Sequence, residues 1–184
     1  NFVPGQDAPS NDIYISDMHG DNSELIASEQ GISAIWLDTN RLLLSISERP
    51  FTQIDIYDTR DNSRYTLGRW YRPRGLSIAP NGERLMFYLA YQPDPQGNGV
   101  YWLDIAENAV PVRVDWFGAY RWRDANSLFY IPFDLDNNSH QLMLYDIPNN
   151  STRPLTDPST QSFTIMDGRW SVNADGTRIL FRNA

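Results

Sequence analysis

The sequence predicts an all-β protein, and three observations support this fold class. Asp and Asn together make up 33 of the 184 residues and Gly and Pro another 23, whereas Glu occurs five times and Lys is absent. Turn formers are therefore abundant and good helix formers are scarce. Short apolar runs recur between the turn residues, and no window shows helical periodicity. Such runs, bounded by Asn-Gly, Asp-Gly or Asn-Asn, are typical of strands; they lie at 13–15, 42–44, 54–57, 85–89, 100–103, 128–131, 142–145 and 179–181.

Internal repetition organises these predicted strands. A dipeptide with Asp in second place ends a strand four times, at Ser16-Asp17, Tyr57-Asp58, Leu103-Asp104 and Tyr145-Asp146. The intervals between the four aspartates are 41, 46 and 42 residues. Each is followed by a polar turn and a second short strand, so this series predicts four strand–turn–strand units.

A second series has the same register. Residues 36–42 (WLDTNRL) match residues 122–128 (WRDANSL), and residues 78–85 (IAPNGERL) match residues 172–179 (VNADGTRI). Each copy predicts a strand, a tight turn and a strand. The two series alternate, which gives eight hairpins and about four strands per period of roughly 45 residues. That period and strand count predict the blade of a β-propeller.

The same residues resemble a known repeat. Residues 78–87, followed by a strand that ends at Leu103-Asp104, resemble the WD40-like (PD40) repeat of TolB-like propellers, and residues 152–156 (TRPLT) look like its outer strand. The first and third copies depart from the family pattern at its Pro and Gly, where they carry Asp38 and Asn40, and Asp124 and Asn126. Asn tolerates the positive φ of such turns almost as Gly does. The resemblance covers nearly the whole chain and implies a β-propeller.

The phase of the repeat predicts how the blades divide the chain. Whole blades are expected at 29–67, 68–114 and 115–156, and a closing blade from 157–184 together with 12–28. We therefore expect a single propeller domain over 1–184 with about four four-stranded blades, in which N- and C-terminal strands share one blade. Sharing a blade would remove exposed sheet edges. Two alternatives remain: a segment of a larger propeller, or a homodimer that completes an eight-bladed ring.

Composition excludes several classes of function. Without cysteine, thiol nucleophiles and cysteine-ligated metals are absent, and without lysine so are Schiff-base chemistry and the lysine of a phosphate loop. The net charge of −8 argues against nucleic-acid binding. No apolar run approaches the roughly 20 residues that span a bilayer, so we expect no membrane insertion. We expect an extracytoplasmic location, periplasmic or at the cell surface, rather than a cytoplasmic one.

Two segments between blades combine arginine with aromatic side chains. Residues 69–74 (RWYRPR) and 115–123 (DWFGAYRWR) occupy equivalent positions in the repeat. Arginine binds carboxylates or phosphates through two parallel hydrogen bonds, and aromatic faces stack on planar groups or sugars. We expect a ligand-binding surface anchored by Trp70, Tyr71, Arg72, Arg74, Trp116, Phe117, Tyr120 and Arg121. The alternative is that the aromatic residues pack one sheet on the next and the arginines pair with nearby aspartates.

The sequence predicts no catalytic residue, metal site or cofactor. No Ser-His-Asp arrangement, glycine-rich phosphate loop or His-x-x-x-His pair is apparent. Residues 134–138 (DLDNN) suit a calcium loop, but Ser139 stands where an EF-hand requires Gly and Tyr145 where it requires Glu. We therefore expect a non-enzymatic module that binds a protein, peptide or glycan through its longer loops. Alternatives are a propeller accessory domain of a hydrolase or peptidase, and a structural or sensor segment of a larger surface protein.

Overall fold

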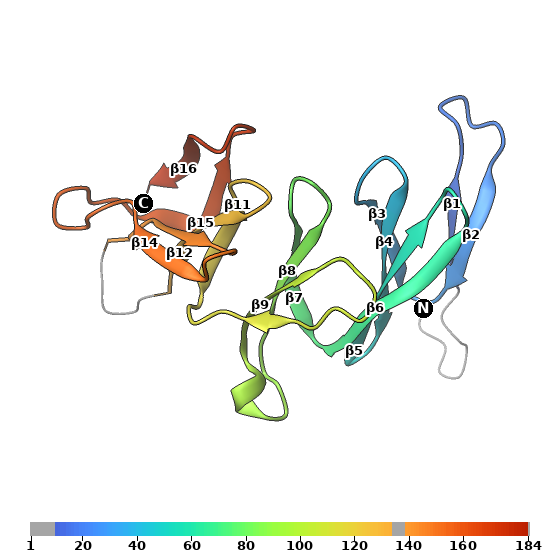
Figure 1. The fold of residues 1–184 in the computed structure, drawn as a ribbon, viewed down its shortest axis with the longest axis horizontal. Coiled ribbons are helices and arrows are strands. Elements are labelled where there is room, and N and C mark those ends of the chain that lie inside the picture. The colour runs from blue at the N-terminus through green and yellow to red at the C-terminus, as the bar shows by residue number, and fades with distance from the viewer. Residues whose placement is uncertain (1–9, 134–138, 184) are drawn as a thin grey trace, which may run out of the picture. The chain divides into compact units, whose positions relative to one another are not determined.

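The computed structural model describes residues 10–133 and 139–183. Apart from one 3-10 turn, η1 (Pro95–Gly97), the regular elements of this part of the chain are strands. They form antiparallel sheets whose strands follow one another in chain order (Figure 1). The prediction of an all-β fold is confirmed.

Three of the sheets have four strands. The first consists of β3 (Ile32–Trp36), β4 (Arg41–Glu48), β5 (Phe51–Asp58) and β6 (Ser63–Tyr71). The second consists of β7 (Pro73–Ile78), β8 (Arg84–Leu89), β9 (Gly99–Asp104) and β10 (Val112–Arg113). The third consists of β11 (Gly118–Trp122), β12 (Ser127–Pro132), β13 (Met143–Asp146) and β14 (Ser151–Pro154). β6 runs four residues past the expected blade boundary at 67, because Leu67 forms a bulge and pairing with β5 resumes at Gly68.

The repeat appears as a common register within these sheets. The aspartate that ends the third strand lies opposite the first residue of the second strand in all three, as Arg41↔Asp58, Arg84↔Asp104 and Ser127↔Asp146. In the second sheet this pair is also an ion pair, with Arg84 Nε 2.9 Å from Asp104 Oδ1. The repeated aspartate therefore marks a fixed position in the pairing of the two middle strands.

The remaining described strands form two-stranded sheets. β1 (Asn11–Ile15) pairs with β2 (Glu24–Glu29), and β15 (Ile165–Val172) pairs with β16 (Ile179–Asn183). These pairs correspond to the outer and the inner half of a blade, as the phase of the repeat predicts. Each pair is a local antiparallel hairpin.

The described chain divides into two compact units, unit 1 with residues 1–73 and 106–109 and unit 2 with residues 74–105 and 110–184. Unit 1 has its core between the sheets β1–β2 and β3–β6, where Ala27 packs with Ile32, Leu44 and Tyr57. Arg64 of β6 links the same sheets, since its Nη2 lies 2.6 Å from Glu29 Oε1 and 2.6 Å from Asp55 Oδ2.

Unit 2 has two further cores between successive sheets. Met86 and Val100 of the second sheet pack against Tyr120, Leu128 and Tyr145 of the third. A separate cluster packs Phe129, Ile131 and Leu144 of the third sheet against Ile165 and Trp170 of β15. Within each unit, neighbouring sheets therefore pack on one another through their own apolar clusters.

Candidate functional site

The eight predicted site residues fall into both units. Trp70, Tyr71 and Arg72 belong to unit 1, and Arg74, Trp116, Phe117, Tyr120 and Arg121 belong to unit 2. The unit 2 residues line two adjoining pockets. Those of unit 1 lie at the end of the β5–β6 pair.

In unit 1 the predicted residues are engaged in local packing. Trp70 is half-buried, and its ring covers Gly68 so closely that a Cβ at position 68 would lie 2.3 Å from it. Tyr71 lies opposite Phe51 in the strand pair and contacts its ring edge-on, with 5.6 Å between centroids. The Arg72 guanidinium lies over the Tyr71 ring at 5.4 Å, and its backbone N–H donates to the Pro50 carbonyl at 3.0 Å. These contacts favour a structural role for the three residues.

In unit 2 the inner strands of the second and third sheets are tied together. The Tyr120 hydroxyl donates to the Gly75 carbonyl at 2.7 Å, and Trp122 Nε1 donates to the Ser77 carbonyl at 3.2 Å. Gly75 has φ +62°, and a Cβ there would lie 2.8 Å from the Tyr88 ring. Glycine at this position therefore allows the close approach of β7 to Tyr88 and Tyr120.

Pocket B opens beside this link and has a volume of about 630 Å³. The described residues that line it are Arg74, Gly75, Leu76, Ser77, Tyr88, Ala90, Tyr91, Phe117, Gly118, Ala119, Tyr120, Arg121 and Phe133. The Phe117 ring is edge-on to Tyr88 at 6.3 Å and to Phe133 at 5.3 Å, and so forms the centre of an aromatic wall. Phe117 is 47% exposed and Phe133 62% exposed. Pocket B thus presents aromatic faces to a ligand.

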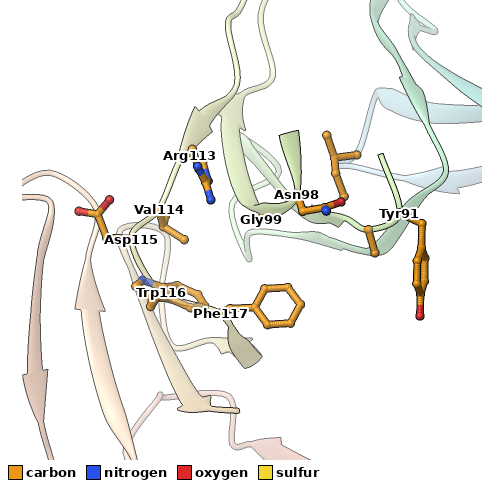
Figure 2. Close-up of a pocket in the computed structure, with 10 residues that line it drawn as sticks. Tyr91, Asn98, Gly99, Arg113, Val114, Asp115, Trp116 and Phe117 are labelled. Atoms are coloured by element: carbon orange, nitrogen blue, oxygen red, sulfur yellow. The ribbon is translucent and has the colours of Figure 1, made fainter. Parts of the chain in front are cut away.

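Pocket A adjoins pocket B, has a volume of about 560 Å³, and shares Ala90, Tyr91 and Phe117 with it. The rest of its described lining is Leu89, Asn98, Gly99, Arg113, Val114, Asp115 and Trp116. Figure 2 shows the Phe117 ring projecting toward the Tyr91 side of this pocket, while the Asp115 carboxylate points away from it. A ligand that filled both pockets would pass over Phe117.

Tyr91 lines both pockets, although the sequence pattern did not select it. It follows β8, is 72% exposed, and has φ +58°, a left-handed conformation that is unfavourable for a bulky side chain. Such strain tends to persist at functional sites. No motif or repeat position in the sequence distinguishes Tyr91 or Phe133 from the other residues between the predicted strands.

The two pocket B arginines have different environments. Arg121 donates from Nε to the Trp170 carbonyl at 3.0 Å and from Nη1 to the Tyr120 carbonyl at 2.7 Å, so it serves the packing of β11 on β15. The exposed Arg74 guanidinium lies 5.8 Å from the Tyr91 ring centroid. Within residues 10–133 and 139–183 it makes no ion pair or hydrogen bond. Arg74 is therefore the pocket B cation available to a ligand.

Trp116 and Tyr120 are mainly core residues. The Trp116 ring stacks on Tyr130 with centroids 4.1 Å apart and meets the Tyr145 ring edge-on at 5.6 Å. Its buried Nε1 finds no acceptor in the described part of the chain. Burial raises the pKa of Tyr120 well above its ordinary value and also raises the pKa of Tyr130, so both hydroxyls stay neutral.

Asp38 and Asp124 occupy the same place in the repeat, and each accepts a hydrogen bond that stabilises its own turn. Asp38 Oδ1 accepts from the backbone N–H of Asn40 at 2.8 Å, and Asp124 Oδ1 does the same with Asn126 at 2.8 Å. The hydrogen bond from Asn40 is the largest cause of the lowered pKa of Asp38. Their position in the repeat is explained by this turn geometry.

Carboxylates, histidines and groups of metal ligands are scarce around pockets A and B in the described residues. The described lining of pockets A and B contains one carboxylate, Asp115, and no histidine. No group of three His, Asp or Glu side chains that could bind a metal occurs within 10–133 and 139–183. The calcium-loop candidate at 134–138 lies outside the described residues. No helix in the described residues is long and apolar enough to cross a membrane.

Successive four-stranded antiparallel sheets, with strands in chain order and apolar clusters between sheets within each unit, are typical of the β-propeller class. Comparison with solved structures agrees. TolB from Acinetobacter baumannii is 21% identical, with a TM-score of 0.56 over 92% of this chain and 42% of that protein. An oligogalacturonate lyase in complex with manganese is 14% identical, with a TM-score of 0.56 over 90% of this chain and 48% of that protein. The chain therefore spans less than half the length of either protein.

No family model matches the sequence, and neither does any curated protein. At these identities the structural likeness establishes the fold. It leaves the ligand to be inferred from the pockets of unit 2.

Proposed function

We propose that this chain is a binding module of the TolB-like, PD40-repeat kind that captures a peptide, protein or glycan without chemical change. One observation carries the proposal: exposed Tyr91, Phe117 and Phe133 surround two adjoining pockets whose described lining includes the uncommitted Arg74. Apolar pockets with a few directed polar groups are the usual form of a ligand site.

The physical argument concerns exposure and strain. Three large aromatic side chains grouped at pockets lose contact with water when a ligand covers them, which favours binding by the hydrophobic effect. Tyr91 adopts its unfavourable backbone conformation while 72% exposed, so core packing does not explain its placement. A role in contacting a ligand accounts for this placement of Tyr91.

The anchors of this proposed site are Arg74, Tyr91, Phe117 and Phe133, with Trp116, Tyr120 and Arg121 as their packed support. The propeller accessory domain of a hydrolase, the structural segment, the homodimer and the extracytoplasmic location remain predictions. None of them is needed for the pockets to bind a ligand.

The test is a binding screen with matched variants. The purified chain is screened against peptide and glycan arrays, and each hit is repeated with Phe117→Ala, Tyr91→Ala and Tyr14→Ala. Tyr14 is the control, since it is an aromatic residue 57% exposed in β1 and lies outside both pockets. We expect the first two variants to lose binding and the third to keep it, with all three melting like the wild type. Hits that survive both pocket variants would refute the proposal.

A further inference from the structure

Pocket B is apolar over most of its described surface and cationic at its rim. Leu76, Tyr88, Phe117 and Phe133 supply its apolar walls. The described lining contains two arginines and no Asp or Glu, in a chain whose net charge is −8. This polarity suits a ligand with an apolar group next to an anionic one.

Arg74 is suited to the anionic group. It lies at the start of β7, is exposed, and keeps its guanidinium beside the Tyr91 ring. Its N–H groups make no hydrogen bond or ion pair within residues 10–133 and 139–183, so they are available for two parallel hydrogen bonds to a carboxylate. Arg121 instead donates to two backbone carbonyls, so the carboxylate is assigned to Arg74.

The walls favour an apolar side chain over a sugar. A sugar needs directed hydrogen bonds to its hydroxyl groups in addition to an aromatic face. The buried Tyr120 hydroxyl already donates to the Gly75 carbonyl, and of the four side chains named above as apolar walls only that of Tyr88 has a polar atom. The lining therefore favours the binding of an aromatic or branched aliphatic group.

We infer that pocket B binds the C-terminal residue of a peptide, with a large apolar side chain against Phe117 and Phe133 and its α-carboxylate on Arg74. A C-terminal residue is the one peptide unit that carries both groups on the same Cα. The preceding residues would lie over Phe117 toward pocket A, which shares Tyr91 and Phe117 with pocket B. This inference rests on the proposed binding function and names the ligand class of its site.

The experiment compares four probes by calorimetry or by amide chemical shifts: Gly-Ser-Gly-Phe as the free acid, its C-terminal amide, Gly-Ser-Gly-Gly as the free acid, and a glucuronate disaccharide. We expect the Phe acid to bind at least about tenfold more tightly than its amide, because a charge-assisted pair is lost. The Gly peptide should bind at least as weakly as the amide. Preferential binding of the disaccharide would overturn the inference.

Variants complete a double-mutant cycle. Arg74→Gln should weaken the Phe acid about tenfold and leave the amide unchanged, which isolates the Arg74–carboxylate contact. Arg74→Lys should recover only part of the affinity, since it keeps the charge and loses the planar fork. Arg153→Gln, at an exposed arginine of β14 outside both pockets, is the control and should bind like the wild type.

The inference fails if acid and amide bind equally, or if Arg74→Gln weakens both alike. Its failure is distinguishable from that of the proposed function. If a ligand with no free carboxyl end is lost in Phe117→Ala and kept in Tyr14→Ala, the binding module stands and the assignment to peptide ends is wrong.

Discussion

The links at 69–74 and 115–123 occupy equivalent places in the repeat and have similar compositions, yet their aromatic residues have different environments. In the first, Trp70 and Tyr71 belong to the nine-residue strand β6 and are half-buried in local contacts. In the second, the outer strand β10 has only two residues, and Trp116 and Phe117 lie in the link between β10 and β11. The length of the neighbouring outer strand thus decides whether the same residue types continue a sheet or line a pocket.

The largest expected effect distinguishes the glycines of the two regions. In Gly118→Ala the new Cβ would lie 2.1 Å from the Ile131 carbonyl oxygen, and a paired backbone has little room to move. In Gly68→Ala it would meet the Trp70 side chain, which can rotate. We expect Gly118→Ala to lose about 3 kcal/mol or more of unfolding free energy and Gly68→Ala about 1 kcal/mol. Guanidinium unfolding measures both, and equal losses would contradict the contrast.

As with the glycines, substitution of the tryptophan in the second link, Trp116, should cost more stability than substitution of Trp70 in the first. Trp116 stacks on Tyr130 within the core between the second and third sheets, while Trp70 covers a glycine at the end of a strand. Trp116→Ala should cost about 3 kcal/mol of stability and Trp70→Ala about half of that. Urea unfolding of the two variants side by side is the measurement. A larger loss for Trp70→Ala would show that the first link carries more of the packing than its contacts indicate.

Tyr120 belongs to the second link, and the pH dependence of stability tests its hydroxyl group. Tyr120→Phe removes the hydrogen bond to Gly75 and should cost about 1 kcal/mol at pH 7. Because the pKa of Tyr120 is raised in the folded state, its hydroxyl stabilises the fold fully below about pH 10 and loses this effect as pH rises further. The wild-type advantage should therefore shrink by about 1.4 kcal/mol per pH unit above about pH 10. Unfolding at pH 7, 9 and 11 tests this, and a constant difference would refute it.

The smallest effect concerns the strained residues of the two regions. Tyr91 and Arg72 both have positive φ, at +58° and +47°. Asn tolerates this conformation, so Tyr91→Asn and Arg72→Asn should each gain about 0.5 kcal/mol of stability. Only Tyr91→Asn should weaken ligand binding, since Arg72 lies outside both pockets. Melting curves and the binding assay together decide whether Tyr91 serves function at a cost in stability.

Part of the candidate site could be predicted from the sequence. The arginine-aromatic composition identified Arg74 and Phe117, and it also selected Trp70, Tyr71 and Arg72, whose contacts are local. It did not select Tyr91 or Phe133, because a single aromatic residue in a long polar loop looks the same whether it faces solvent or a pocket. The pairing of Tyr120 with Gly75, 45 residues earlier, has no local signal at all.

By itself the sequence determined the class of fold, the order of the strands and the position of their turns. These follow from short-range chemistry: short apolar runs, turn-forming Asn, Asp and Gly, and an aspartate that recurs at the end of a strand, as at Asp58 and Asp104. Only the tertiary structure decided which aromatic residues stay exposed and which arginine remains available. Those outcomes depend on contacts between segments tens of residues apart, where the packing of one sheet on another determines exposure and no periodicity along the chain records it.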